Sequence, residues 1–166
     1  MTFRPATGGQ MLLTTALACT ILLAMGVLFL VLGYQYRERG GAHYALLVGG
    51  CVILVLLVGS LGFRIRSYQI NSGNLVIKVG FSAKTLSLKG LESVRTEDRP
   101  FAGCRRDFGV GGFWSNYGRF TSPRWGKFLA YASDTSRGVL LVWPDEKVLV
   151  TPADVPSFLQ ALKPKQ

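Results

Sequence analysis

The stretch MLLTTALACTILLAMGVLFLVLG, residues 11–33, contains no charged residue and is apolar along almost its whole length. A second stretch of the same kind, YALLVGGCVILVLLVGSLGF, covers residues 44–63. As an α-helix, each would be about 30 Å long, which is roughly the thickness of the hydrocarbon core of a bilayer. The sequence therefore predicts two transmembrane helices, about 11–33 and 44–63, in a chain of 166 residues.

A cleaved signal peptide is the alternative interpretation of the first stretch. The apolar core of a signal peptide is typically about 7–15 residues long. Here the apolar run continues well past Cys19, where the sequence faintly resembles a lipoprotein cleavage site, and Arg4 alone would form the basic leader. We therefore favour a helical hairpin around the loop YQYRERGGAH and assign residues 1–66 to it.

The charges that flank the two helices predict the orientation of the hairpin, whose two ends lie on the same side of the membrane. The loop between the helices carries Arg37 and Arg39. The other side carries Arg4, Arg64 and Arg66. Because basic residues are more frequent on the cytoplasmic side, we expect both termini in the cytoplasm.

Small residues recur every four positions in the first helix, at Ala16, Thr20 and Ala24. Small side chains allow two helices to approach closely within a membrane. The spacing therefore predicts that the second helix packs against Ala16, Thr20 and Ala24. In the alternative interpretation these residues are ordinary positions that face lipid.

Residues 67–166 change to short segments in which apolar and polar residues alternate, which is typical of β-strands. The segment YQINSGNLVIKVG reads as two strands around the turn at Asn71–Asn74, and Pro144 begins a turn between two later strands. Seven or eight short strands at this spacing predict a small antiparallel barrel or sandwich.

The end of the chain changes to helical spacing. Val155, Phe158, Leu159 and Leu162 lie at i, i+3, i+4 and i+7, which places them on one face of a helix. Asp154 is a residue type that favours the N-cap position. We expect a C-terminal helix over about 154–163 that closes the β domain.

This combination resembles the bacterial pleckstrin-homology-like (bacterial PH domain) membrane proteins. The resemblance rests on the strand pair around LVIKVG, the step LSLKGLESV, the segment Arg105 to Gly118 and the hydrophobic hairpin before Pro152. It implies an α+β membrane protein in which a two-helix transmembrane hairpin precedes a PH-like antiparallel β-barrel capped by a C-terminal α-helix. Eukaryotic PH domains bind phosphoinositides through basic residues of the first hairpin, but the turn INSGNL lacks them, so that site is not transferred.

Residues 99–127 combine basic and aromatic side chains, and Asp107 is the only acidic residue among them. Cations and amphipathic rings are typical of the headgroup region of a membrane. The same composition suits single-stranded nucleic acid, but a domain tethered beside a bilayer meets lipid first. The candidate lipid-binding or partner-binding residues are Arg99, Arg105, Arg106, Trp114, Arg119, Arg124, Trp125 and Lys127.

The alternative for this segment is a structural role. Its glycines would bend strands, its aromatic side chains would fill the core, and its arginines would form a solvated rim. In either case we expect residues 105–120 to form a glycine-bent strand-and-loop element that performs no chemistry.

No motif predicts catalysis, a cofactor or a metal. Gly109, Gly111 and Gly112 precede no helical pattern, and no Lys-Ser/Thr pair follows them, so neither a dinucleotide fingerprint nor a P-loop is present. Ser115 lacks the flanking glycines of a nucleophile elbow, and His43, the only histidine, lies outside residues 67–166. The three cysteines have no disulfide or zinc spacing.

We therefore expect a membrane-anchored, non-catalytic binding or scaffolding module at the cytoplasmic surface of a bacterial inner membrane. Its expected partners are the lipid bilayer and either anionic headgroups or a membrane protein. The alternative is an enzyme, or an accessory subunit of a membrane enzyme or transport complex, which a cleft lined by Asp107, Ser115 and an arginine would favour. A channel is a third class, and because the helices carry no charge it would require several copies.

Overall fold

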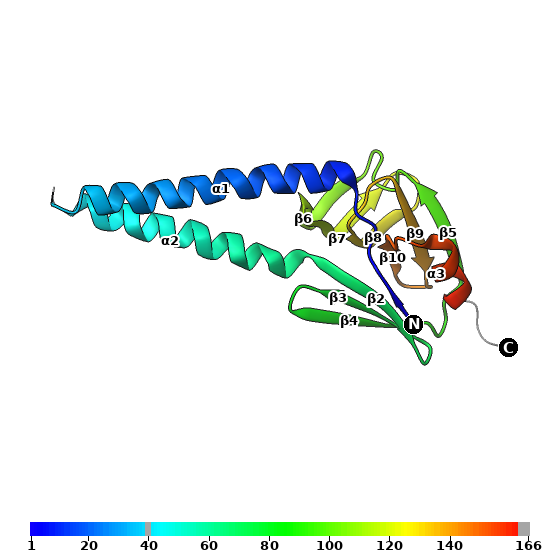
Figure 1. Cartoon of the computed structure of the whole chain (residues 1–166). Helices are drawn as coiled ribbons and strands as arrows, with labels where there is room; N and C mark the ends of the chain where they lie inside the picture. Colours follow the sequence, from blue (N-terminus) through cyan, green and yellow to red (C-terminus); the bar gives the residue numbers. More distant parts are fainter. Residues whose placement is uncertain (39–40, 163–166) are drawn as a thin grey trace.

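The computed structural model describes residues 1–38 and 41–162. A helical hairpin, α1 (Gly9–Gln35) and α2 (Ala42–Ser60), extends from a β-rich part formed by the rest of the chain (Figure 1). Both helices are long and apolar enough to cross a membrane, by length and composition. Figure 1 shows that the start of α1 and the end of α2 lie beside the β-strands, whereas the end of α1 lies far from them.

The predicted helices correspond closely to the observed ones. The first extends by two residues at each end relative to 11–33, and the second ends earlier, at Ser60, where a 3₁₀ turn, η1 (Leu61–Phe63), continues the chain. The C-terminal helix is α3 (Val155–Leu162). Asp154 caps it, because Oδ1 accepts a hydrogen bond from the Ser157 backbone N–H at 3.0 Å. Lys163, the last residue predicted for this helix, lies outside the described residues.

The helices α1 and α2 do pack against each other, but the prediction that this contact lies at Ala16, Thr20 and Ala24 is wrong. Ala16, Thr20 and Ala24 are all exposed. The helices are closest near their junction and separate toward the β-strands (Figure 1). Glycines make the close approach possible: a Cβ atom on Gly50 would lie 2.9 Å from the backbone oxygen of Gly26. Because glycine presents no side chain, it allows a closer backbone approach than alanine or threonine.

The strands form two sheets rather than a closed barrel, so of the two predicted β-architectures the barrel is wrong. The four-stranded sheet has the order β1 (Thr2–Phe3), β2 (Ile65–Asn71), β3 (Asn74–Val79), β4 (Ser82–Ser87). The six-stranded sheet has the order β5 (Ser93–Asp98), β9 (Arg137–Val142), β10 (Lys147–Val150), β8 (Gly126–Ala132), β7 (Ser115–Ser122), β6 (Arg105–Phe113).

One strand pair also departs from the predicted antiparallel pattern. The turn that begins at Pro144 does join β9 and β10 as an antiparallel hairpin, with the Trp143 N–H donating to Glu146 O at 2.8 Å. On its other side, however, β10 pairs with β8 in parallel, with Val148 opposite Leu129. The β9–β10 hairpin therefore lies between β5 and β8 in the sheet.

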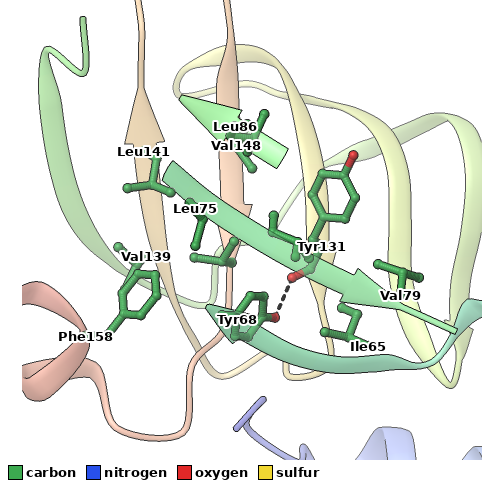
Figure 2. Packing of buried hydrophobic residues seen from close by; sticks show 12 residues of the cluster. Ile65, Tyr68, Leu75, Val79, Leu86, Tyr131, Val139, Leu141, Val148 and Phe158 are labelled. Atoms are coloured by element: carbon green, nitrogen blue, oxygen red, sulfur yellow. Dashed lines mark hydrogen bonds between the residues drawn. The ribbon is translucent and has the colours of Figure 1, made fainter. Parts of the chain in front are cut away.

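The main core lies between the two sheets and α3 (Figure 2). Tyr68 of β2 is fully buried there, and its hydroxyl donates to Tyr131 O at 2.7 Å while accepting from the Thr151 N–H at 3.2 Å. Burial raises the pKa of Tyr68 to about 12. The core side chains drawn around it include Leu75 and Val79 from the same sheet and Leu141, Val148 and Phe158 from across the interface. A second core cluster contains Phe120, Phe128, Ala130, Ala132, Leu140 and Leu149.

The segment before α1 packs within the β-rich part. β1 pairs with β2, the Ala6 N–H donates to Thr151 O at 2.8 Å, and Ser133 Oγ donates to Ala6 O at 2.7 Å. Residues 2–8 thus link the two sheets and lead directly into the hairpin. The division of the chain at residue 66 stays a prediction, and the structure adds that the first residues share the fold of the β-strands.

Candidate functional site

The turn between β6 and β7 lies at the base of the helical hairpin. The Trp114 backbone N–H donates to Thr15 Oγ1 of α1 at 3.1 Å, and its indole Nε1–H donates to Ser60 Oγ of α2 at 3.0 Å. Ser115 Oγ donates to Phe63 O, just beyond α2, at 2.6 Å. A single β-turn therefore contacts both helices at the point where they have separated.

Glycines allow β6 and β7 to reach this position. Gly109 and Gly118 lie opposite each other, with φ angles of +114° and +134°. A Cβ on Gly109 would lie only 2.1 Å from Tyr117 O, and one on Gly118 would lie 2.2 Å from Phe108 O. Because other residue types rarely adopt such φ angles, both positions require glycine. The segment is a glycine-bent strand pair, as its sequence predicts.

The predicted basic and aromatic residues do not form one surface. Trp114 is held between the helices, as described above. Arg105, Arg119 and Lys127 line a groove on the six-stranded sheet, with a volume of about 550 Å³. The Arg106 guanidinium instead donates to a backbone carbonyl of its own strand at 3.5 Å.

The remaining candidates gather in a third place, between β5 and the turn that precedes β8. The guanidinium of Arg124 pairs with Glu97 at 3.5 Å, donates to Arg99 O at 3.3 Å and lies 4.7 Å from the centre of the Trp125 ring. Trp125 itself packs on the second core cluster. These residues therefore contact one another and the protein core, which agrees with the structural alternative for them.

The groove on the six-stranded sheet carries charges of both signs. Lys147 joins its basic residues, but Asp107, Asp145 and Glu146 line it too. Asp107 accepts hydrogen bonds from Thr121 Oγ1 at 2.5 Å and Arg105 Nε at 3.1 Å, and these bonds hold its pKa below the ordinary value. The excess of basic residues over residues 99–127 is thus reduced by acids that come from the β9–β10 turn.

The residues that would have formed a catalytic cleft are separated. Asp107 lies in the groove beside Thr121, whereas Ser115 is fully buried at the opposite end of β7. Along a strand, this difference in position corresponds to about 20 Å. Among residues 1–38 and 41–162, no three His, Cys, Asp or Glu side chains gather closely enough to hold a metal ion.

A second cavity, of about 730 Å³, lies at the base of the hairpin. It is bounded by residues 4–8, the first turns of α1, the start of η1 and the start of β2, and Trp114 forms part of its wall. Arg4, Arg64 and Arg66 line it. In the sequence, these arginines indicate only the orientation of the hairpin. The signal that could have identified them is the presence of basic residues just before the first apolar stretch and just after the second.

Comparison with known proteins adds one finding. Residues 66–166, which are more than half of the chain, match the sequence profile of a family described as Bacterial PH domain. No curated protein and no solved structure matches the chain.

Proposed function

Because this chain belongs to the bacterial PH domain family, we propose that it is a membrane-anchored, non-catalytic binding module. The hairpin inserts into a bacterial inner membrane, and the PH-like part lies at the cytoplasmic surface. Large apolar side chains along both helices support insertion, for example Leu13, which is 72% exposed, and Val55, which is 70% exposed. A continuous apolar surface of this kind is unfavourable in water.

The observation that carries the proposal is the attachment of the β6–β7 turn to both helices. Trp114 bonds to Thr15 and Ser60, and Ser115 bonds to Phe63. Residues 2–8 provide a second link through β1. A hairpin inserted in a bilayer would therefore hold the β-part against the headgroups, with Trp114 at the depth where indole rings are most frequent.

Binding is favoured over catalysis because the polar residues that could form a catalytic site, Asp107 and Ser115, are not arranged for one. Asp107 and Ser115 are too far apart to act on one substrate, and Ser115 already donates to a backbone carbonyl. An accessory subunit of a membrane complex remains the alternative, and it would use the same anchored β-part as its binding surface.

The proposal is tested by alkaline extraction of membranes and by reporter fusions to the full chain. We expect the chain to stay in the membrane pellet at alkaline pH. A reporter that is active only in the periplasm should be silent after Gln166 and active when inserted at Gly41, with a cytoplasmic reporter at both positions as the control. Release into the supernatant would contradict anchoring, and the reverse reporter pattern would contradict the cytoplasmic orientation.

A further inference from the structure

The cavity at the base of the hairpin combines an apolar wall with a basic one. Met11 and Leu12 of α1 and Leu61 after α2 form apolar parts of the lining. Arg4 and Arg64 line it from the segments that flank the helices. A phospholipid has the same division, with an anionic phosphate at one end and acyl chains at the other.

The arginines of this cavity have cationic groups available for a ligand. In the part of the chain that the structure describes, Arg4, Arg64 and Arg66 make no ion pair, and all three are exposed. The guanidinium of Arg64 lies 5.8 Å from the centre of the Trp114 ring, and that of Arg66 lies 5.8 Å from the Phe81 ring. Contact with a ring face positions a guanidinium while leaving its N–H donors free for an anion.

Among residues 1–38 and 41–162, no acidic residue lines the cavity. Asp134 lies next to the cavity at Gly8, where its Oδ1 would be 2.7 Å from a Cβ on that residue. Its carboxylate accepts hydrogen bonds from the Ser136 backbone N–H at 3.1 Å and from Ser136 Oγ at 2.5 Å. The positive charge of the three arginines is therefore not balanced within the cavity lining, in contrast to the groove on the six-stranded sheet.

In a bilayer spanned by the hairpin as proposed, the cavity would lie at the depth of the phosphate layer. Arg64 follows the last residues of the apolar segment, and Arg4 precedes α1 on the same side. The exposed Phe81, in the β3–β4 turn, lies beside Gly62 at this level. Cations next to an anionic leaflet attract its phosphates, and aromatic rings settle at the same depth.

From this cavity we infer that Arg4, Arg64 and Arg66 bind the phosphate of an anionic phospholipid, whose acyl chains run along the apolar ends of α1 and α2. The inference rests on the proposed membrane anchoring and assigns that function a ligand site. The guanidinium groups supply bidentate donors to the phosphate oxygens. A soluble phosphate shares this chemistry but has no acyl chain to occupy the apolar wall.

The test uses the full chain in nanodiscs of phosphatidylcholine with a minority of phosphatidylglycerol. Native mass spectrometry after release from the discs counts the lipids that stay bound. The wild-type chain should retain phosphatidylglycerol in preference to phosphatidylcholine. The triple variant Arg4→Gln/Arg64→Gln/Arg66→Gln should abolish this preference, because three arginine contacts with the phosphate together correspond to about a hundredfold. Arg4→Gln alone, which removes a side chain with no ion pair in the described structure, should lower it by about fivefold.

The matched control is Arg105→Gln/Arg119→Gln/Lys127→Gln, which removes the same charge from the groove on the six-stranded sheet and should retain the lipid. Added inorganic phosphate should not displace it. The lipid site is contradicted if the Arg4 variants retain phosphatidylglycerol as the wild type does, if the control loses it equally, or if inorganic phosphate displaces it. A chain that fails to enter discs of phosphatidylcholine alone contradicts the membrane anchoring itself. A chain that enters the discs without preferring phosphatidylglycerol contradicts only the lipid site.

Discussion

Tyr68 links the two sheets through its hydroxyl group, which bonds to Tyr131 O and Thr151 N (Figure 2). Replacement by phenylalanine leaves a buried carbonyl and a buried N–H without this partner. We expect Tyr68→Phe to lower the free energy of unfolding by about 1–2 kcal/mol, measured by thermal unfolding of the full chain in detergent. Tyr131→Phe is the matched control, because its hydroxyl has no hydrogen-bond partner among the described residues. Equal effects of the two variants would contradict the role of the Tyr68 hydroxyl.

The raised pKa of the same residue predicts a loss of stability at alkaline pH. An unfolded tyrosine ionises near its ordinary pKa of 10.0, whereas folded Tyr68 stays protonated up to about 12. The folded state thus binds more protons in this window, and stability should fall by about 2 kcal/mol as the pH rises from 10 to 12. Unfolding midpoints of the wild type and of Tyr68→Phe across this range measure the difference. The variant should show a shallower loss, and identical slopes would refute the assignment to Tyr68.

At the scale of elements, the packing of α1 against α2 depends on glycine. Gly50→Ala would place a methyl group 2.9 Å from Gly26 O, whereas Gly59→Ala on the same helix meets nothing within 4 Å. Alanine is the better helix former by about 1 kcal/mol. We therefore expect Gly59→Ala to leave the thermal midpoint of the chain in detergent unchanged or raised, and Gly50→Ala to lower it. Equal midpoints for the two variants would show that the glycine contact contributes nothing.

The elements set by local sequence could be predicted, and those set by distant pairing could not. The length of the two apolar stretches predicts α1 and α2. The helical spacing of the apolar residues around Phe158 predicts α3, and Asp154 predicts its N-cap. The parallel pairing of β10 with β8 could not be predicted, because nothing in the sequence of either strand identifies the strand with which it pairs. β1 spans only Thr2–Phe3, which is too short for a period-two pattern.

The same distinction applies to the candidate sites. The excess of basic residues between Arg99 and Lys127 belongs to one continuous segment, so it can be recognised in the sequence. The fold, however, distributes the candidate residues of this segment over separate places. Asp145 and Glu146 join them from another turn. The cavity of Arg4 and Arg64 is assembled from segments on either side of the hairpin, and only the fold brings them together.

At the scale of the whole molecule, the proposed function requires a hairpin that spans a bilayer and holds Trp114 at its surface. Trp114 contacts the ends of both helices. Strand β4 begins at Ser82, next to Phe81, which lies beside Gly62 at the helix end. Trp143 lies at the other end of this strand, because its Nε1–H donates to Ser87 O. The two indoles therefore report on different distances from the membrane.

The most direct test is the quenching of each tryptophan by brominated lipids in nanodiscs that contain the full chain. One variant, Trp125→Phe/Trp143→Phe, keeps Trp114 alone, and a second, Trp114→Phe/Trp125→Phe, keeps Trp143 alone. We expect strong quenching of Trp114 by lipids brominated near the headgroup, weaker quenching by lipids brominated near the acyl end, and no quenching of Trp143. Quenching of neither tryptophan, or equal quenching of both, would contradict a β-part held at the membrane surface by the β6–β7 turn.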